Sequence, residues 1–177
     1  MNRRRVLERV VQAFSITGLG FIVYPFIKAG LPAPTDGPGR DVDVSRLAPG
    51  KVKLVNWLGR RVLILRRSPD MVRQITEWPQ LALKDPDSSA SSQPAFARNP
   101  WRSRGPEIFV AFTNCTHLGC EVMPVSGDGV GFRCPCHRSD YDYAGRVLRD
   151  AAAPLNLEVP DYRLVSGNTL RLEKKEA

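Results

Sequence analysis

The sequence has 177 residues, of which 42% are hydrophobic and 25% charged, proportions that suit a globular domain with a substantial core. They exclude a chain that is disordered or fibrous throughout. The formal net charge is +8, an excess that first suggests binding to nucleic acid. Arg3, Arg4, Arg5 and Arg9 lie at the N-terminus, however, and the other basic residues are scattered without a basic helix or stripe. We therefore expect no nucleic-acid partner.

An apolar segment without charged residues extends from Val10 to Ile27 and has the length of a short membrane-spanning helix. We predict that residues 1–29 form a cytoplasmic N-terminus and a transmembrane anchor, because the arginines precede the span. A cleaved signal peptide is the alternative, although no clear small-residue cleavage site follows the span. Residues 2–7 also resemble a twin-arginine export signal.

Residues 30–41 are rich in Pro and Gly, and we interpret them as a flexible hinge linker. From 42 to 177 we predict one soluble domain of mostly antiparallel β-structure in stacked sheets. The segments with strand patterning are 41–44, 51–55, 61–66, 108–112, 162–165 and 170–172. A hairpin turn is expected at 166–168, between the last two strands.

One short helix is predicted between the strands. Ser68 is the expected N-cap and Pro69 the first helical residue, and the helix should end near Trp78. Residues 86–106 are rich in Ser, Pro, Asn and Arg, so we interpret them as a long surface loop.

All four cysteines and both histidines lie in two short segments, Cys-Thr-His-Leu-Gly-Cys at 115–120 and Cys-Pro-Cys-His-Arg-Ser at 134–139. Two loops that each carry Cys and His indicate a metal centre. Three interpretations compete: a structural zinc site, two disulfides with idle histidines, and a [2Fe–2S] cluster held by two Cys and two His. The spacings Cys-x-His and Cys-x-x-His fit zinc poorly and favour the cluster.

These motifs, together with residues 153–160, resemble the Rieske iron–sulfur subunit of cytochrome bc complexes, and the resemblance covers nearly the whole chain. It implies a mainly β fold, a Rieske-type antiparallel β sandwich with a two-loop cluster-binding subdomain, and one N-terminal transmembrane helix. The residues that it implies around a single [2Fe–2S] cluster are Cys115 and Cys134 on the buried iron, His117 and His137 on the outer iron, Cys120 and Cys136 in a disulfide, and Ser139 and Tyr141 as hydroxyl donors to sulfur.

The same resemblance implies an electron-transfer subunit of a respiratory quinol–cytochrome c oxidoreductase that is not active alone. Its partners would be cytochrome b and a membrane-anchored c-type cytochrome, in a dimeric complex that contributes to proton translocation. His137, with His117, would meet the quinol and take a proton. Leu118 and Pro154 would shape an apolar docking rim. The expected location is the bacterial inner membrane, with the Rieske domain in the periplasm.

Arg138 departs from the family pattern, which usually has Gly after the second His ligand. A side chain at this position needs a compatible backbone angle, and it adds a positive charge beside the cluster loop. Three other classes remain as alternatives: the small Rieske subunit of arsenite oxidase, a Rieske ferredoxin of an oxygenase, and a zinc-binding interaction module.

Overall fold

The computed structural model describes residues 3–30, 39–77, 79–125 and 130–174. The chain divides into two units, Met1–Thr35 and Asp36–Ala177. The first unit contains the helix α1, Arg3–Gly30. In the described part of the chain, α1 is the one helix long and apolar enough to cross a membrane, with a mean hydropathy of 1.7 in its most apolar window. This agrees with the apolar span expected from the sequence.

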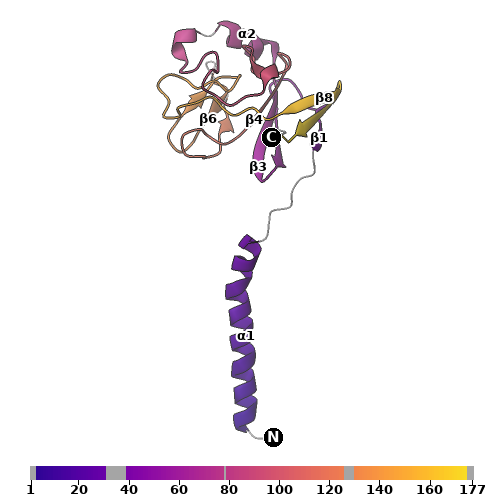
Figure 1. The fold of residues 1–177 in the computed structure, drawn as a ribbon, viewed down its shortest axis with the longest axis vertical. Helices are drawn as coiled ribbons and strands as arrows, with labels where there is room; N and C mark the ends of the chain where they lie inside the picture. Colours follow the sequence, from indigo (N-terminus) through magenta and orange to yellow (C-terminus); the bar gives the residue numbers. More distant parts are fainter. Residues whose placement is uncertain (1–2, 31–38, 78, 126–129, 175–177) are drawn as a thin grey trace. The chain divides into compact units, whose positions relative to one another are not determined.

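The second unit consists of three small antiparallel sheets, each of three strands (Figure 1). Their strand orders are β1–β9–β8, β2–β3–β4 and β5–β6–β7. The strands are β1 Gly39–Asp43, β2 Val52–Trp57, β3 Arg60–Arg66, β4 Ile108–Phe112, β5 Met123–Pro124, β6 Phe132–Arg133, β7 Asp140–Tyr141, β8 Tyr162–Ser166 and β9 Thr169–Glu173. β1 and β8 lie on one side of the domain and β6 on the other, with β3 and β4 between them (Figure 1). The expected mainly β architecture is confirmed.

The central strand β3 supplies much of the core. It pairs with β2 on one side and with β4 on the other. Its four consecutive apolar residues, Val62 to Leu65, are all buried, which explains why this segment is a continuous β-branched and aliphatic run rather than an alternating one. The middle of β3 is therefore covered on both faces of the sheet.

The β-domain begins earlier than residue 42. β1 starts at Gly39, which lies opposite Glu173 of β9. The Asp41 carboxylate accepts two hydrogen bonds from the Arg171 guanidinium across the same strand pair. Residues 39–41 therefore belong to a sheet and not to a linker, because they pair with the C-terminal strand. The rest of the expected linker, 31–38, lies outside the described residues.

The helix α2, Pro69–Glu77, has the expected start. The Ser68 side-chain oxygen accepts a hydrogen bond of 3.3 Å from the Met71 N–H, as an N-cap does. Two short 3₁₀ helices, η1 at Gln80–Ala82 and η2 at Ala95–Ala97, follow it.

The expectation of a surface loop at 86–106 is wrong for part of the segment. Ala97, Arg102 and Ser103 are fully buried. The Arg102 guanidinium donates hydrogen bonds to the backbone carbonyls of Ala144, Gly145 and Leu157. Polar composition suggested exposure, but a buried arginine whose donors all find carbonyl groups holds the segment inside the domain.

We predict that Gly145→Ala destabilises the domain by about 3 kcal/mol, whereas Gly59→Ala costs about 1 kcal/mol. Both glycines have left-handed backbone angles, with φ of +68° and +71°. A Cβ on Gly145 would lie 2.7 Å from the Phe109 ring, while a Cβ on Gly59 would have no heavy atom within 4 Å. Urea denaturation of the two variants measures the difference. Equal losses would contradict close packing at Gly145.

Candidate metal centre

Two loops at the same part of the domain carry all the Cys and His residues. The first loop, 113–122, connects β4 to β5, and the second loop, 134–139, connects β6 to β7. Each is closed by backbone hydrogen bonds that start at its first cysteine: the Cys115 N–H donates to the Cys120 carbonyl, and the Cys134 N–H donates to the Ser139 carbonyl. These backbone hydrogen bonds help to fix the shape of each loop.

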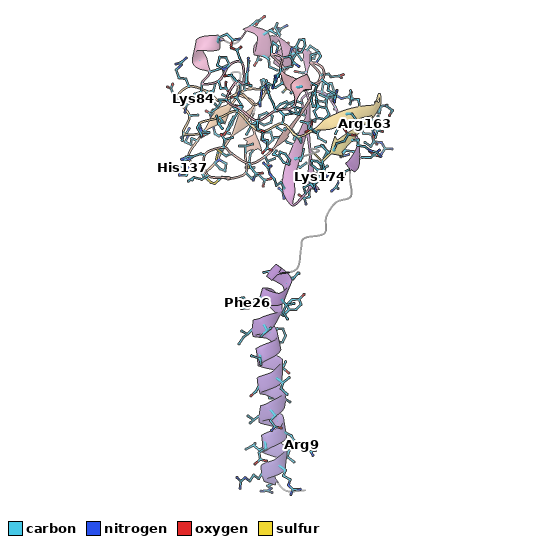
Figure 2. The ribbon with its side chains drawn as sticks, in the orientation of Figure 1. Arg9, Phe26, Lys84, His137, Arg163 and Lys174 are labelled. Carbon is cyan, nitrogen blue, oxygen red and sulfur yellow. A yellow bond between two sulfur atoms is a disulfide. The ribbon has the colours of Figure 1, made fainter. Side chains whose placement is uncertain are left out.

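The thiols and the imidazoles occupy different depths. Cys115 and Cys134 are free cysteines and are buried. His117 and His137 are exposed, and their ring centroids lie 4.7 Å apart. Figure 2 shows His137 at the edge of the domain, on the side away from Arg163. This arrangement provides two inner sulfur donors and two outer nitrogen donors.

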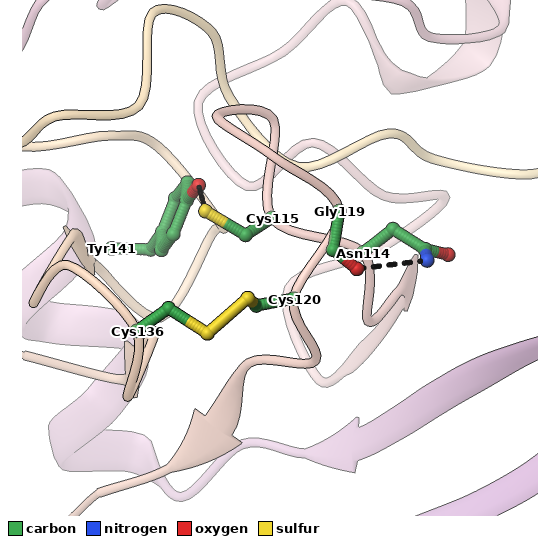
Figure 3. Close-up of a disulfide and its surroundings, with 6 residues drawn as sticks. All are labelled: Asn114, Cys115, Gly119, Cys120, Cys136 and Tyr141. Atoms are coloured by element: carbon green, nitrogen blue, oxygen red, sulfur yellow. Dashed lines mark hydrogen bonds between the residues drawn. A yellow bond between two sulfur atoms is a disulfide. The ribbon is translucent and has the colours of Figure 1, made fainter.

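A disulfide between Cys120 and Cys136 joins the two loops (Figure 3). Its Cα atoms are 6.5 Å apart. The Cys134 sulfur lies within 4.8 Å of both disulfide sulfurs. The bonded pair cannot act as thiolate ligands, so the cysteines divide into one cross-link and two potential ligands.

Tyr141 contacts the first cysteine directly. Its side chain is fully buried, and its hydroxyl oxygen lies 3.2 Å from the Cys115 sulfur (Figure 3). The hydroxyl accepts a hydrogen bond of 3.4 Å from the Thr116 N–H. Burial raises the pKa of Tyr141, so the hydroxyl keeps its proton and is able to donate it to sulfur.

A third segment, 153–155, is bound to both loops. The Ser139 hydroxyl oxygen, which is buried, accepts a hydrogen bond of 2.9 Å from the Ala153 N–H. The Thr116 hydroxyl donates to the Leu155 carbonyl at 2.6 Å. Pro154 is exposed between these two anchors, and Leu118 in the first loop is 71% exposed. Both residues named as an apolar rim therefore lie at the surface.

Thr116 was not identified from the sequence as a structural residue of the site, although it lies between Cys115 and His117 in the motif. It bonds the first loop both to Tyr141 and to Leu155. Its position between two candidate ligands could have indicated that its hydroxyl bonds groups near the site.

The turn after Tyr141 is held by three buried arginines. Arg67 donates to the Tyr143 carbonyl, Arg102 to the Ala144 and Gly145 carbonyls, and Arg146 to the Asp142 carboxylate. Burial lowers the pKa of Arg67 to about 9, which still leaves its guanidinium charged at neutral pH. These contacts were not predicted, because each joins residues far apart in the sequence or lies in a segment without a motif.

The donors fit a [2Fe–2S] cluster. Burial raises the pKa of the Cys134 thiol, so a thiolate at that depth needs a cation beside it. Two buried sulfurs and two exposed imidazoles match the division of ligands between two irons in a Rieske centre. Cys and His are also the residues that bind zinc, so the residue types alone do not separate the two kinds of centre.

Comparison with known proteins distinguishes these classes. Residues 96–163 match the family model of the Rieske [2Fe-2S] domain. Fold and site thus define a Rieske iron–sulfur protein, for which a [2Fe–2S] cluster is the implied cofactor.

The chain is 36% identical to the ubiquinol-cytochrome c reductase iron-sulfur subunit of Allochromatium vinosum, over 95% of this chain and 86% of that protein. It therefore belongs to the family of Rieske subunits of cytochrome bc complexes, which are redox subunits of oxidoreductases. It is also 39% identical to the mitochondrial cytochrome b-c1 complex Rieske subunit of Solanum tuberosum, over 73% of this chain and 45% of that protein.

A solved structure shares the fold. A chain of a hyperthermophilic respiratory Complex III aligns with a TM-score of 0.50 and 21% identity, over 92% of this chain and 98% of that chain. This likeness supports the Rieske-type architecture.

We predict that replacing both Cys120 and Cys136 by Ser lowers the free energy of unfolding of the cluster-free protein by about 3 kcal/mol, because the disulfide closes a loop of about 16 residues. Chemical denaturation of the oxidised protein measures the change. Cys115→Ser, which keeps the disulfide, is the matched control and should lose less. An equal loss in the control would show that the cross-link adds no stability of its own.

Proposed function

We propose that this chain is the electron-transfer subunit of a respiratory quinol–cytochrome c oxidoreductase. The observation that carries the proposal is the pair of exposed imidazoles, 4.7 Å apart, next to two buried free thiols. The sequence similarity to the Allochromatium subunit over most of both chains supports it. An electron from quinol would pass through this subunit to a membrane-anchored c-type cytochrome, and the complex would contribute to proton translocation.

Cys115 and Cys134 would hold the inner iron, and His117 and His137 the outer iron. When bound, the cluster supplies a one-electron acceptor whose potential lies above that of an all-cysteine ferredoxin, since neutral imidazoles replace two thiolates. The burial of the two thiols and the exposure of the two imidazoles support this division.

The exposed residues around the imidazoles form what we call the docking tip: His117, Leu118, His137, Arg138 and Pro154. Leu118 and Pro154 offer apolar surface to a partner or to the quinol ring. His137 would receive the quinol proton on the ring nitrogen that is not bound to iron. Coupling the proton to the electron avoids a charged quinol intermediate.

The N-terminal segment 1–29 would anchor the subunit in a bacterial inner membrane. Arginines at one end of α1 and a single lysine at the other favour a cytoplasmic N-terminus and a periplasmic domain. Residues 2–7 would act as a twin-arginine signal, and the part of the predicted linker 30–41 that precedes β1 would serve as a hinge. Cytochrome b and a c-type cytochrome would be the partners, in a dimeric complex.

Electron paramagnetic resonance of the purified full-length chain tests the proposal. We expect a Rieske-type spectrum after reduction with ascorbate, and iron and sulfide in equal amounts. A spectrum that requires dithionite would contradict a high-potential centre, and zinc in place of iron would overturn the cluster. Turnover with quinol after reconstitution with cytochrome b and the c-type cytochrome distinguishes this function from that of an arsenite oxidase subunit.

We predict that Tyr141→Phe lowers the midpoint potential by about 40–90 mV. The lost hydrogen bond to the Cys115 sulfur contributes about 1–2 kcal/mol, and a tenfold change in a one-electron equilibrium is 59 mV. Ser139→Ala should also lower the potential. Among the described residues the Ser139 hydroxyl oxygen accepts a bond from the Ala153 N–H, and its own proton would be free to bond a cluster sulfide. A redox titration followed by paramagnetic resonance measures each shift.

Tyr143→Phe is the matched control. Tyr143 is also buried, but within the described residues its hydroxyl contacts no cysteine sulfur. The midpoint potential of the Tyr143→Phe variant should equal that of the wild type. A shift as large as that of Tyr141→Phe would mean that general packing, and not the bond to sulfur, sets the effect.

A further inference from the structure

We propose that Arg138 is the residue by which the docking tip recognises an acidic face on the c-type cytochrome that accepts the electron. The inference rests on the proposed function and adds to it the chemistry of the partner surface: a carboxylate facing the outer end of the second loop. Two independent features of Arg138 support it, its backbone conformation and its unpaired charge.

The backbone of Arg138 is in the left-handed region, with φ of +52°. The first loop has the same kind of backbone angle beside its ligand segment, φ of +78°, and there the residue is Gly119. Glycine adopts this conformation without a steric cost, whereas a residue with a Cβ does not. The second loop thus keeps a long charged side chain at a position where glycine would be more favourable. Strain next to a functional residue is a reason to look for a function of the strained side chain itself.

The charge of Arg138 has no partner within the described part of the domain. Three arginines that contact or flank the two loops, Arg60, Arg61 and Arg133, form ion pairs with Glu158, Glu121 and Asp140. Arg138 is exposed, and no hydrogen bond or ion pair joins it to another described residue.

Arg138 directly follows His137 in the sequence, so its charge lies at the docking tip, beside the apolar side chains of Leu118 and Pro154. An unpaired guanidinium at such a place is available to a carboxylate of another molecule, which it can bind through two parallel hydrogen bonds.

The acceptor cytochrome is the partner that this charge suits. Encounters between electron-transfer proteins are small and transient, and charges at the rim of such interfaces set the association rate. A quinol is uncharged and has no carboxylate with which the guanidinium could form an ion pair, whereas the surface of a cytochrome carries such groups. In each productive encounter one electron leaves the reduced holoprotein and converts the ferric haem of the cytochrome to ferrous haem.

Stopped-flow oxidation of the reduced, cluster-loaded full chain tests the inference. The probes are two soluble c-type cytochromes, one acidic and one basic, each used at low and at high salt. We expect Arg138→Gln to slow the reaction with the acidic cytochrome about two- to fivefold at low salt and to reduce its salt dependence, because one steering charge is lost. Arg138→Lys should retain most of the rate, and the reaction with the basic cytochrome should not slow.

Lys174→Gln is the charge-matched control. Lys174 is exposed and lies away from His137 in the domain (Figure 2). It should leave the rate unchanged, and an equal loss in both variants would overturn the inference by showing that net charge alone matters. A loss in Arg138→Gln of the same size at low and at high salt would also overturn it, since the charge would then act on the driving force.

Arg138→Gly separates function from folding. This variant should unfold at or above the wild-type temperature and still lose rate with the acidic cytochrome. A variant that is both as fast as the wild type and equally salt-dependent would contradict the inference. The spectrum after ascorbate reduction reports on the proposed function separately, because it does not depend on a partner.

Discussion

The centre depends on one constraint: two loops from different strand pairs must present their side chains to a common point. Three kinds of contact meet it. The Cys120–Cys136 disulfide joins the loops covalently. The segment 153–155 is bonded to both through Ser139 and Thr116. Tyr141 adds a contact from the strand behind the second loop to the first cysteine. All three contacts are made by groups of the protein, and together they hold the proposed ligand residues of the two loops near one another.

The arginines around the turn 142–145 bond polar groups inside the domain, next to the proposed centre. A tight turn next to Tyr141 leaves carbonyl groups that point into the domain, where water does not reach them. Arg67 and Arg102 supply several donors each and satisfy those groups. Burying a guanidinium is unfavourable unless its N–H groups are bonded, and here the carbonyls and Asp142 meet that condition. The charged residues are thus part of the core that supports the centre.

The sequence predicted the elements that arise from local patterns. The run at 61–66 became β3, and Ser68 with Pro69 began α2, because strand patterning and capping depend on neighbouring residues. The ligand candidates were recognisable since Cys and His gather in two motifs. Burial of the segment containing Arg102 was not predictable in this way, because the backbone carbonyls that accept its hydrogen bonds lie about forty or more residues away in the chain. The pairing of Gly39 with Glu173 was missed for the same reason.

The short distances between the sulfur atoms of Cys120, Cys134 and Cys136 affect whether loss of the cluster is reversible. Cys134 lies within 4.8 Å of both sulfurs of the disulfide, near enough for thiol–disulfide exchange by a small movement. A thiolate that is bound to iron is not free to attack. In the proposed centre Cys134 would be bound to iron. If the iron were lost, the Cys134 thiolate could form a disulfide with one sulfur of the bond and release the other, and a proposed ligand would be removed. Damage to the cluster would then become permanent through scrambled cysteines, even where the β-sheets remain intact.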